Sequence, residues 1–274
     1  HGLVTLALII LGATAVPAVV KALLCFRLVP DLRIGSRHVS KEVAKKLSGY
    51  GIWYFFLSME QPILPQFVNL IIGNRLGAGA VTPYAIAARL TGYATSFSIA
   101  STQVVTPQAT ALHAEGKHTE QQRLVLAGGK YCLTLELFFF SLFLFLGQTF
   151  IGLWMGTGLD YAWHPWQLLV VLALGELLPM SQWISHSTIL GMGRHKVMAW
   201  LSIAEMISTI ALALVLVQPY GLLGVCVSFA VPGALFRGVC QIVYVCRLVE
   251  VPVRTYAATA LLPAVLMAAP AALG

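Results

Sequence analysis

Charged side chains are scarce in this sequence. Asp, Glu, Lys and Arg make up 10% of its 274 residues, while hydrophobic residues make up 58%. A soluble domain carries about 25% charged residues, so this chain has too few to cover a water-facing surface. The apolar residues also form repeated runs of the roughly 20 residues that a helix needs to cross the hydrocarbon core of a bilayer. The shortage excludes an ordinary soluble protein and indicates a multi-pass membrane protein.

Motifs for catalysis and for metal binding are also missing. The sequence contains no GxSxG, Walker, HExxH or helix-opening GxGxxG motif, so it indicates neither an enzyme nor an ATP-driven pump. Any transport would then be passive or ion-coupled, unless a partner supplies the energy. The five cysteines have no metal-ligand spacing, so we expect them to pack as small apolar residues, with no metal and no other cofactor.

The net charge of +7 does not indicate nucleic-acid binding, because the basic residues lie between the apolar runs. The connections after the first, third, fifth and seventh runs hold fourteen Lys and Arg, and the other three connections hold only Arg75. Basic loops remain on the cytoplasmic side of a membrane, so these four connections are predicted to face the cytoplasm. The first run then enters from outside, and an odd number of spans should precede it if the N-terminus is cytoplasmic.

The apolar runs predict an all-α, polytopic membrane protein with about eight transmembrane helices. The chain begins within a run at His1 and ends within another at Gly274, so we expect a fragment of a longer protein. The second and third runs contain Gly, Pro, Asn and Gln, which are tolerated where neighbouring helices or water satisfy them. The predicted spans are Gly2–Leu24, Ser48–Ile72, Val81–Val105, Gly129–Trp154, Trp166–Leu190, Val197–Val217, Gly221–Cys246 and Tyr256–Ala272.

Two of the cytoplasmic connections have helical character. Val39–Leu47 is predicted to be a surface helix that leads into the second span. Gln108–Leu124 is predicted to be a helical elbow at the membrane surface, interrupted at Gly116. A solvated connector is the alternative for both segments.

Six glutamate and arginine residues fall within the predicted spans. Each costs a few kcal/mol at the bilayer centre, so such residues normally face a bundle interior or a wet cavity and find partners. Glu205 and Arg237 each lie about nine residues from the cytoplasmic end of neighbouring antiparallel spans, so they are at the same height and could form an intramembrane ion pair. The six residues are Glu60, Arg89, Glu136, Glu176, Glu205 and Arg237.

Two interpretations of these charges remain open. They could line a substrate cavity, where an arginine would attract a pyrophosphate or an acidic sugar and a carboxylate could bind a coupling proton or sodium ion. They could instead form buried ion pairs that determine how the helices pack. Our candidates for a substrate cavity are Arg89, Glu60, Asn69, Gln66, Glu176 and Glu136.

The segment Asn69–Leu90, NLIIGNRLGAGAVTPYAIAARL, resembles the start of the C-terminal lobe of polysaccharide-exporter flippases, the O-antigen and oligosaccharide flippase family. Three later segments resemble further elements of that family in the same order: Ala114–Leu124, Leu190–Trp200 and Pro219–Val231. One departure is that Asn69 stands where many members carry Asp. The matching residues of the first segment are Gly73, Leu76, Gly77, Val81, Tyr84, Ala87, Arg89 and Leu90.

The resemblance implies a superfamily that also contains multidrug extruders and lipid II flippases, with two six-helix lobes around a cavity. On that template, residues 1–27 would be the last helix of the N-terminal lobe and residues 28–47 a cytoplasmic linker. Residues 48–248 would form the C-terminal lobe, and residues 249–274 would begin an additional helix pair.

The implied activity is the transfer of an undecaprenyl-diphosphate-linked repeat unit across the bacterial cytoplasmic membrane by alternating access. The implied partners are this lipid-linked oligosaccharide, the bilayer, a coupling proton or sodium ion, and polysaccharide polymerase and chain-length proteins. The alternatives are an ion-coupled multidrug or metabolite antiporter, a lipid II flippase, and a membrane protein of polysaccharide assembly that does not transport, such as a polymerase. The nearly uncharged outer loops disfavour a polymerase.

Overall fold

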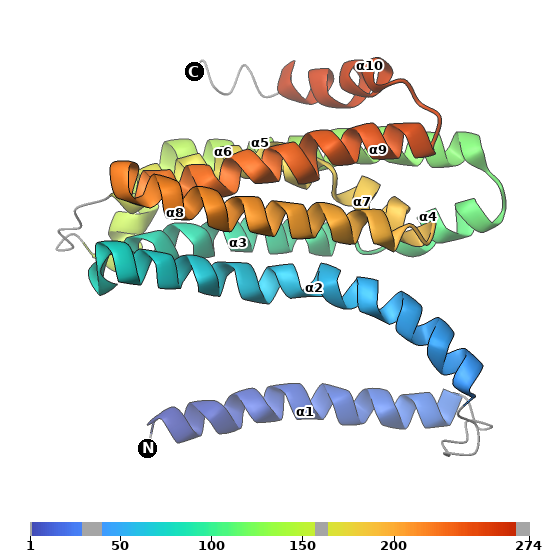
Figure 1. Cartoon of the computed structure of the whole chain (residues 1–274), viewed down its shortest axis with the longest axis horizontal. Coiled ribbons are helices and arrows are strands. Elements are labelled where there is room, and N and C mark those ends of the chain that lie inside the picture. Colours follow the sequence, from blue (N-terminus) through green and yellow to red (C-terminus); the bar gives the residue numbers. More distant parts are fainter. Residues whose placement is uncertain (1, 29–39, 157–163, 267–274) are drawn as a thin grey trace. The chain divides into compact units, whose positions relative to one another are not determined.

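The computed structural model describes residues 2–28, 40–156 and 164–266 (Figure 1). Within these ranges the chain forms helices and turns and no strand. Four helical runs are long and apolar enough to cross a membrane: Leu11–Leu28, His118–Met155, Pro165–Gly191 and His195–Leu248. The prediction of an all-α, polytopic membrane protein is therefore confirmed. The chain divides into two units, His1–Gly49 and Tyr50–Gly274.

The first unit contains α1 (Gly2–Leu28) and the first residues of α2 (Lys41–Leu76). The 27 residues of α1 extend for about 40 Å, enough to span a bilayer. Its side chains Leu8, Leu11 and Leu23 are more than 60% exposed, as expected for a helix that contacts lipid. Ahead of α2, the Ser40 hydroxyl accepts a hydrogen bond from the main-chain N–H of Glu42 and so caps the start of the helix. Most of the predicted linker lies outside the described residues.

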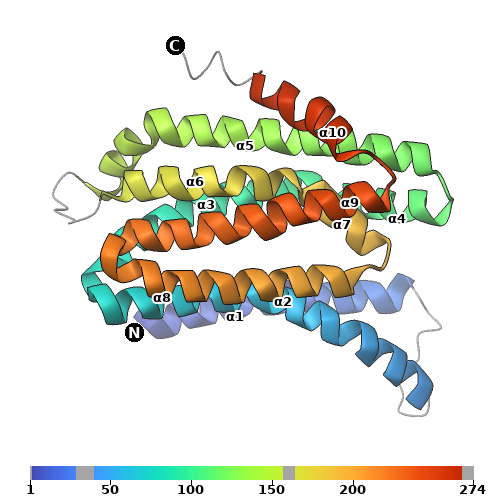
Figure 2. The ribbon, with the colours of Figure 1, turned by 45° about the horizontal axis from the view of Figure 1, so that its top comes forward.

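The second unit is a bundle of long helices joined by short connections (Figures 1 and 2). Helices are present in the second unit at each predicted span, and the last span is described as far as residue 266. The elements after α2 are η2 (Ala78–Ala80), α3 (Val81–Thr102), α4 (Val105–Ala114), α5 (His118–Met155), α6 (Pro165–Ser181), α7 (Trp183–Gly191), α8 (His195–Gly233), the π-helix η3 (Ala234–Cys240), α9 (Gln241–Leu248), α10 (Val253–Tyr256) and the π-helix η4 (Ala257–Leu261).

Chain reversals occur at glycines with positive φ. Gly221 has φ 59° and ψ −137°, so the run from α8 to α9 is two antiparallel arms rather than one helix (Figure 2). The turn separates the sixth and seventh predicted spans at the expected place. Gly116 has φ 68° and separates α4 from α5, which confirms the predicted interruption of the elbow. Glycine adopts this left-handed conformation without the steric cost that a Cβ atom brings.

α2 and α3 are not among the four runs named above that are long and apolar enough to cross a membrane. Both helices carry Gly, Pro and hydroxyl residues among their apolar ones, and α2 also carries Asn and Gln. Such a composition is suited to contact with protein or water rather than with lipid on all sides.

Two apolar clusters form the interior of the second unit. One contains Ile72, Leu169 and Leu222 at one end of the bundle. The other contains Ile189 and Val245 at the opposite end. Along the helices, the ionisable residues of α6, α8 and η3 fall between the two clusters, so the polar centre of the bundle has an apolar layer on either side.

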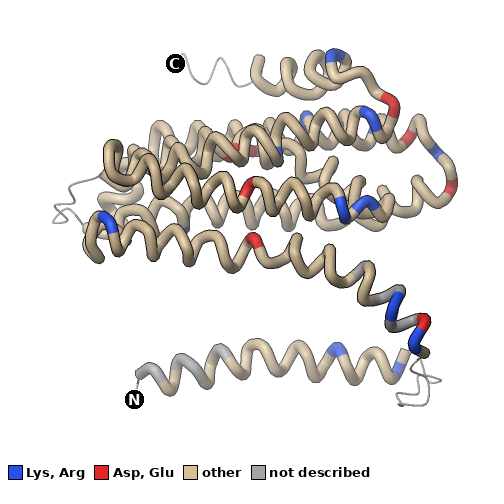
Figure 3. Tube along the Cα trace, in the orientation of Figure 1, with Lys and Arg blue, Asp and Glu red and all other residues tan. Residues whose placement is uncertain are grey.

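Basic residues of the second unit gather at the end of the bundle that carries the α4–α5, α7–α8 and α9–α10 connections (Figure 3). The opposite end, with the α2–α3 connection and the turn at Gly221, carries few charges. This distribution agrees with the orientation expected from the loops, in which the basic end faces the cytoplasm.

Candidate functional site

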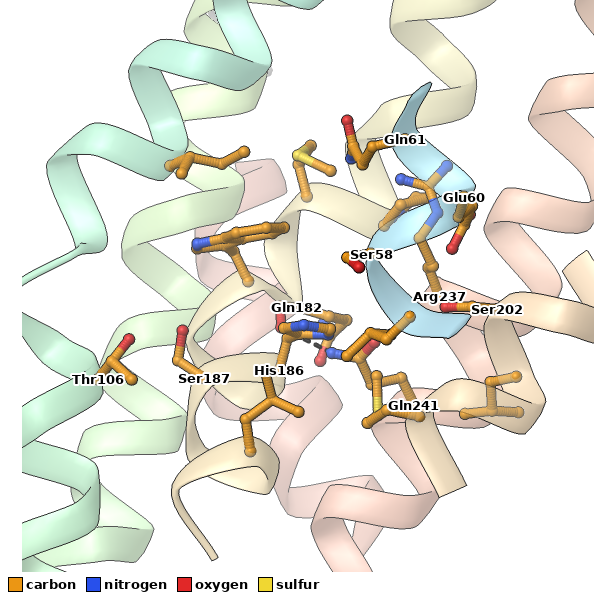
Figure 4. A pocket seen from close by; sticks show the side chains of 18 of the residues that line it. Ser58, Glu60, Gln61, Thr106, Gln182, His186, Ser187, Ser202, Arg237 and Gln241 are labelled. Atoms are coloured by element: carbon orange, nitrogen blue, oxygen red, sulfur yellow. Dashed lines mark hydrogen bonds between the residues drawn. The ribbon is translucent and has the colours of Figure 1, made fainter. Parts of the chain in front are cut away.

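A cavity of about 420 Å³, lined by both apolar and polar side chains, lies within the second unit (Figure 4). Its walls come from α2, the α3–α4 junction, α6, α7, α8, η3 and α9, so segments far apart in the sequence meet there. The polar lining residues are Ser58, Glu60, Gln61, Gln103, Thr106, Gln182, His186, Ser187, Ser202, Arg237 and Gln241.

Arg237 forms the most extensive polar contact of the cavity wall. Its Nε donates to Glu205 Oε1 at 2.7 Å, and its Nη1 and Nη2 donate to the two carboxylate oxygens of Glu176 at 3.2 and 3.1 Å. The second contact has the two-pronged geometry in which arginine binds a carboxylate most strongly. Glu205 is only 1% exposed, whereas the side chains of Arg237 and Glu176 are 24% and 25% exposed.

Two glycines beside Arg237 leave the space that this arrangement needs. A Cβ atom on Gly233 would lie 3.0 Å from Arg237 Nη2 and 3.5 Å from Glu205 Oε1. A Cβ atom on Gly238 would lie 2.8 Å from the Leu178 side chain. Arg237 itself lies in the π-helix η3, a local widening that is frequent at functional sites.

Glu60 brings a third carboxylate to the same region. It lies on α2, next to Arg237 at one side of the cavity (Figure 4). Arg237, Glu176 and Ser202 are among its electrostatic neighbours. Glu205 Oε2 has no hydrogen-bond partner within the described part of the chain. Carboxylates therefore outnumber guanidinium groups three to one around Arg237.

A break between α6 and α7 organises the neighbouring wall. Gln182 leaves the helical conformation at φ −94° and ψ 8°, shortly after Pro179. Its main-chain oxygen accepts a hydrogen bond from Gln241 Nε2 at 2.8 Å, and its side-chain oxygen accepts one from the Tyr256 hydroxyl at 3.1 Å. The same main-chain oxygen accepts the N–H of His186 at 2.8 Å as the first hydrogen bond of α7, so Gln241 of α9 is its second donor at the break.

The rings of Trp183 and His186 add a flat surface to the cavity lining. Their centroids are 5.3 Å apart with an interplanar angle of 14°, so the rings are stacked. Both residues line the cavity. Among the described residues, no group of His, Cys, Asp and Glu could hold a metal ion.

Six of the eight predicted site residues do not line this cavity, and four of these six also lie away from Arg237. Glu136 on α5 is 5% exposed and accepts a hydrogen bond from the Ser98 hydroxyl of α3. Asn69 on α2 is half-buried, and its Oδ1 has no hydrogen-bond partner in the described ranges. Gln66 on α2 and Arg89 on α3 are exposed.

Arg89 lies on a face of α3 that the rest of the unit leaves open. Its exposed neighbours on this face include the small or polar residues Thr82, Ala85, Gly92 and Ser96, together with the larger Tyr93. No described carboxylate forms an ion pair with Arg89. Because a charged side chain in contact with lipid is costly, this face of α3 is expected to meet protein or water in the membrane.

The structure thus separates the eight predicted residues into two sets. Glu60, Glu176, Glu205 and Arg237 come together, while Arg89, Asn69, Gln66 and Glu136 are distributed over α2, α3 and α5. Sequence reasoning had placed Glu205 and Arg237 at one height, but it had not paired Glu176 with either of them. The contact between Glu176 and Arg237 was missed because it depends on which helices are neighbours.

A curated protein of Shigella flexneri, named "Putative O-antigen transporter", is similar to this chain. The two are 25% identical over 203 residues, which cover 73% of the chain and 47% of that protein. The matched region thus spans about half the length of this relative. No family model matches the sequence, and no solved structure matches it.

Proposed function

We propose that this chain is the C-terminal half of a flippase that moves a lipid-linked oligosaccharide from the cytoplasmic to the outer leaflet of a bacterial cytoplasmic membrane. The observation that carries the proposal is a cavity between the helices of the bundle whose lining includes amide, hydroxyl and charged side chains. The similarity to part of a protein named as an O-antigen transporter, together with the flippase motifs, indicates the kind of cargo.

The lining of the cavity is suited to a carbohydrate. Amides and hydroxyls such as those of Gln61, Gln103 and Ser187 can both donate and accept hydrogen bonds, as the hydroxyl groups of a sugar require. A volume of about 420 Å³ falls within the usual range for ligand pockets.

The cavity is near the end of the bundle that we assign to the cytoplasm. Leu190 and Met198 line it and lie within a few residues of the basic α7–α8 connection. A lipid-linked unit would therefore enter from the cytoplasmic leaflet, and alternating access would then open the pathway to the other side.

We assign the parts of the chain to lobes by analogy with the flippase family. Residues 48–248 would be the C-terminal lobe, α1 the last helix of the N-terminal lobe, residues 28–47 the linker and residues 249–274 the start of a further helix pair. The open face of α3 with Arg89 would then border the pathway between the lobes. Since this half has no ATP-binding motif, the energy source would be a proton or sodium gradient. Polysaccharide polymerase and chain-length proteins would be the cellular partners.

The test is complementation of a host that lacks its own O-unit flippase, using the full-length gene at matched expression. We expect the wild type to restore surface polysaccharide. The Arg89→Ala variant should restore at least tenfold less of it than the wild type does. The matched control is Arg123→Ala, which removes an exposed arginine at the cytoplasmic end of α5 and should complement like the wild type.

Failure of the wild type to complement several hosts with different repeat units, with the protein present in the membrane, would contradict the proposal. Ion-coupled drug efflux would then be measured, since an antiporter of the same superfamily is the alternative. Complementation by Arg89→Ala would keep the flippase function and remove Arg89 from the pathway.

A further inference from the structure

The cavity leaves little positive charge available for an anion. Arg237 is the only Lys or Arg among the described residues that line it. Three of its five N–H groups already donate to Glu176 and Glu205. A negatively charged group of a ligand would have to compete with two carboxylates that hold the guanidinium on both sides.

Glu60 adds negative charge to the cavity wall itself. It interacts electrostatically with Arg237 and with Glu176, and it lines the cavity whereas Glu176 and Glu205 do not. An anionic ligand would therefore approach a carboxylate, and like charges at close range in a poorly hydrated site repel strongly. A carboxylate can instead accept hydrogen bonds from hydroxyl groups.

The remaining surface of the cavity is neutral. Gln61 and Gln103 present exposed amides from two different helices. Trp183, with the stacked ring of His186, supplies a flat apolar surface. This combination of amides, one carboxylate and an aromatic face fits a ring that carries hydroxyl groups and no charge.

From these contacts we propose, resting on the function proposed above, that the cavity receives uncharged sugar residues and discriminates against acidic ones. Glu60 is the specificity-determining residue. The diphosphate of the carrier lies outside the cavity, because the described lining offers no Lys or Arg side chain that is not already paired with a carboxylate. Arg89 does not supply a positive charge to the cavity either. It is ten residues before Ile99, the first residue of α3 that lines the cavity, and this separation corresponds to about 15 Å along the helix.

The experiment compares three repeat units that differ at one sugar, in the flippase-deficient host with the full-length protein. The first carries a neutral hexose, the second the corresponding uronic acid, and the third the amide of that uronic acid. The amide has the size of the uronic acid and none of its charge. We expect the wild type to export the neutral and amidated units at similar rates and the acidic unit at least tenfold more slowly.

Glu60→Gln keeps the shape and the hydrogen bonding of Glu60 and removes its charge. We expect this variant to reduce the ratio between the export rates of the amidated and acidic units at least threefold. The matched control is Glu120→Gln, which changes an exposed glutamate near the start of α5 and should leave the ratio at its wild-type value.

Equal export of the acidic and amidated units by the wild type would overturn the inference and leave the flippase function standing. An unchanged ratio in Glu60→Gln would overturn the role of Glu60. Export of none of the three units by an expressed protein would count against the proposed function itself. These three results are distinguishable in a single set of strains.

Discussion

The two arginines that lie inside predicted membrane spans, Arg237 and Arg89, have opposite surroundings. Arg237 on η3 is held by Glu176 and Glu205 between two apolar layers. Arg89 on α3 is exposed among small and polar neighbours, and no described carboxylate pairs with it. The sequence presents both as single charges in apolar runs, at similar expected cost.

The comparison shows two ways in which a membrane protein accommodates a guanidinium group. Within the bundle, opposite charges and directed hydrogen bonds offset the loss of water. On the open face, compensation must come from outside the described helices. We therefore expect Arg237 to determine stability and Arg89 to determine transport. The following experiments test this division in order of decreasing effect.

The largest effect is expected from Arg237→Ala. The substitution leaves the buried Glu205 without its counter-charge, and breaking a buried ion pair in this way costs about 3–5 kcal/mol. The loss is measured as a lower midpoint of thermal unfolding of the full-length protein in detergent. Arg237→Lys should restore part of it, since lysine keeps the charge but not the two-pronged contact. An unchanged midpoint in Arg237→Ala would remove the distinction between the two arginines.

A pair of glycine substitutions compares the two surroundings without changing charge. In Gly238→Ala the new Cβ atom would lie 2.8 Å from Leu178, and such overpacking costs about 1–3 kcal/mol. In Gly92→Ala, on the face of Arg89, nothing lies within 4 Å of the new atom. Alanine is favoured over glycine in a helix by roughly 0.5–1 kcal/mol, so this variant should be neutral or slightly more stable. Equal destabilisation by both would show that the face of Arg89 is closely packed.

A double-mutant cycle sharpens the assignment of Arg237 to Glu205. Arg237→Met and Glu205→Gln are made singly and together, and unfolding is followed by denaturant titration in detergent. Residues in direct contact typically couple by about 0.5–3 kcal/mol, so the double variant should be more stable than the sum of the single losses predicts. The matched cycle of Arg89→Met with Glu205→Gln should give no coupling. Coupling in the second cycle would mean that Arg89 also reaches the centre of the bundle.

The smallest effect on stability is expected from Arg89→Ala. Substitutions of exposed residues usually change stability by less than about 0.5 kcal/mol, so the unfolding midpoint should stay close to that of the wild type. The same variant is expected to lose transport in the complementation assay. A large loss of stability would place Arg89 in a packed contact instead.

Much of the fold was predictable because its signals are local. Apolar runs of membrane-spanning length and the basic loops between them follow from composition alone, and helices are present in the described residues at each predicted span. The breaks at Gly116 and Gly221 were also predicted, since turn residues mark them. The π-helix around Arg237 and the break at Gln182 were not, because both depend on contacts between α6 and the α8–α9 hairpin.

The candidate site was only partly predictable for a related reason. Counting residues along a helix gives the height of a charge in the membrane, and this was enough to bring Glu205 and Arg237 together. It does not give the direction in which a side chain points relative to helices that are distant in sequence. Glu176 and Glu60 therefore joined the cluster only in three dimensions, while Arg89 and Glu136 stayed apart from it.

The sequence by itself determined that the chain crosses a membrane many times, which ends of the helices are basic, and which residues carry charge into the membrane. These properties depend on the transfer of each segment from water to lipid, which is nearly independent of the other segments. The tertiary structure alone decided which charges neutralise one another and which remain available. That choice depends on the packing of α2, α6, α8 and η3 around one cavity, where a few ångströms separate an ion pair from an open site.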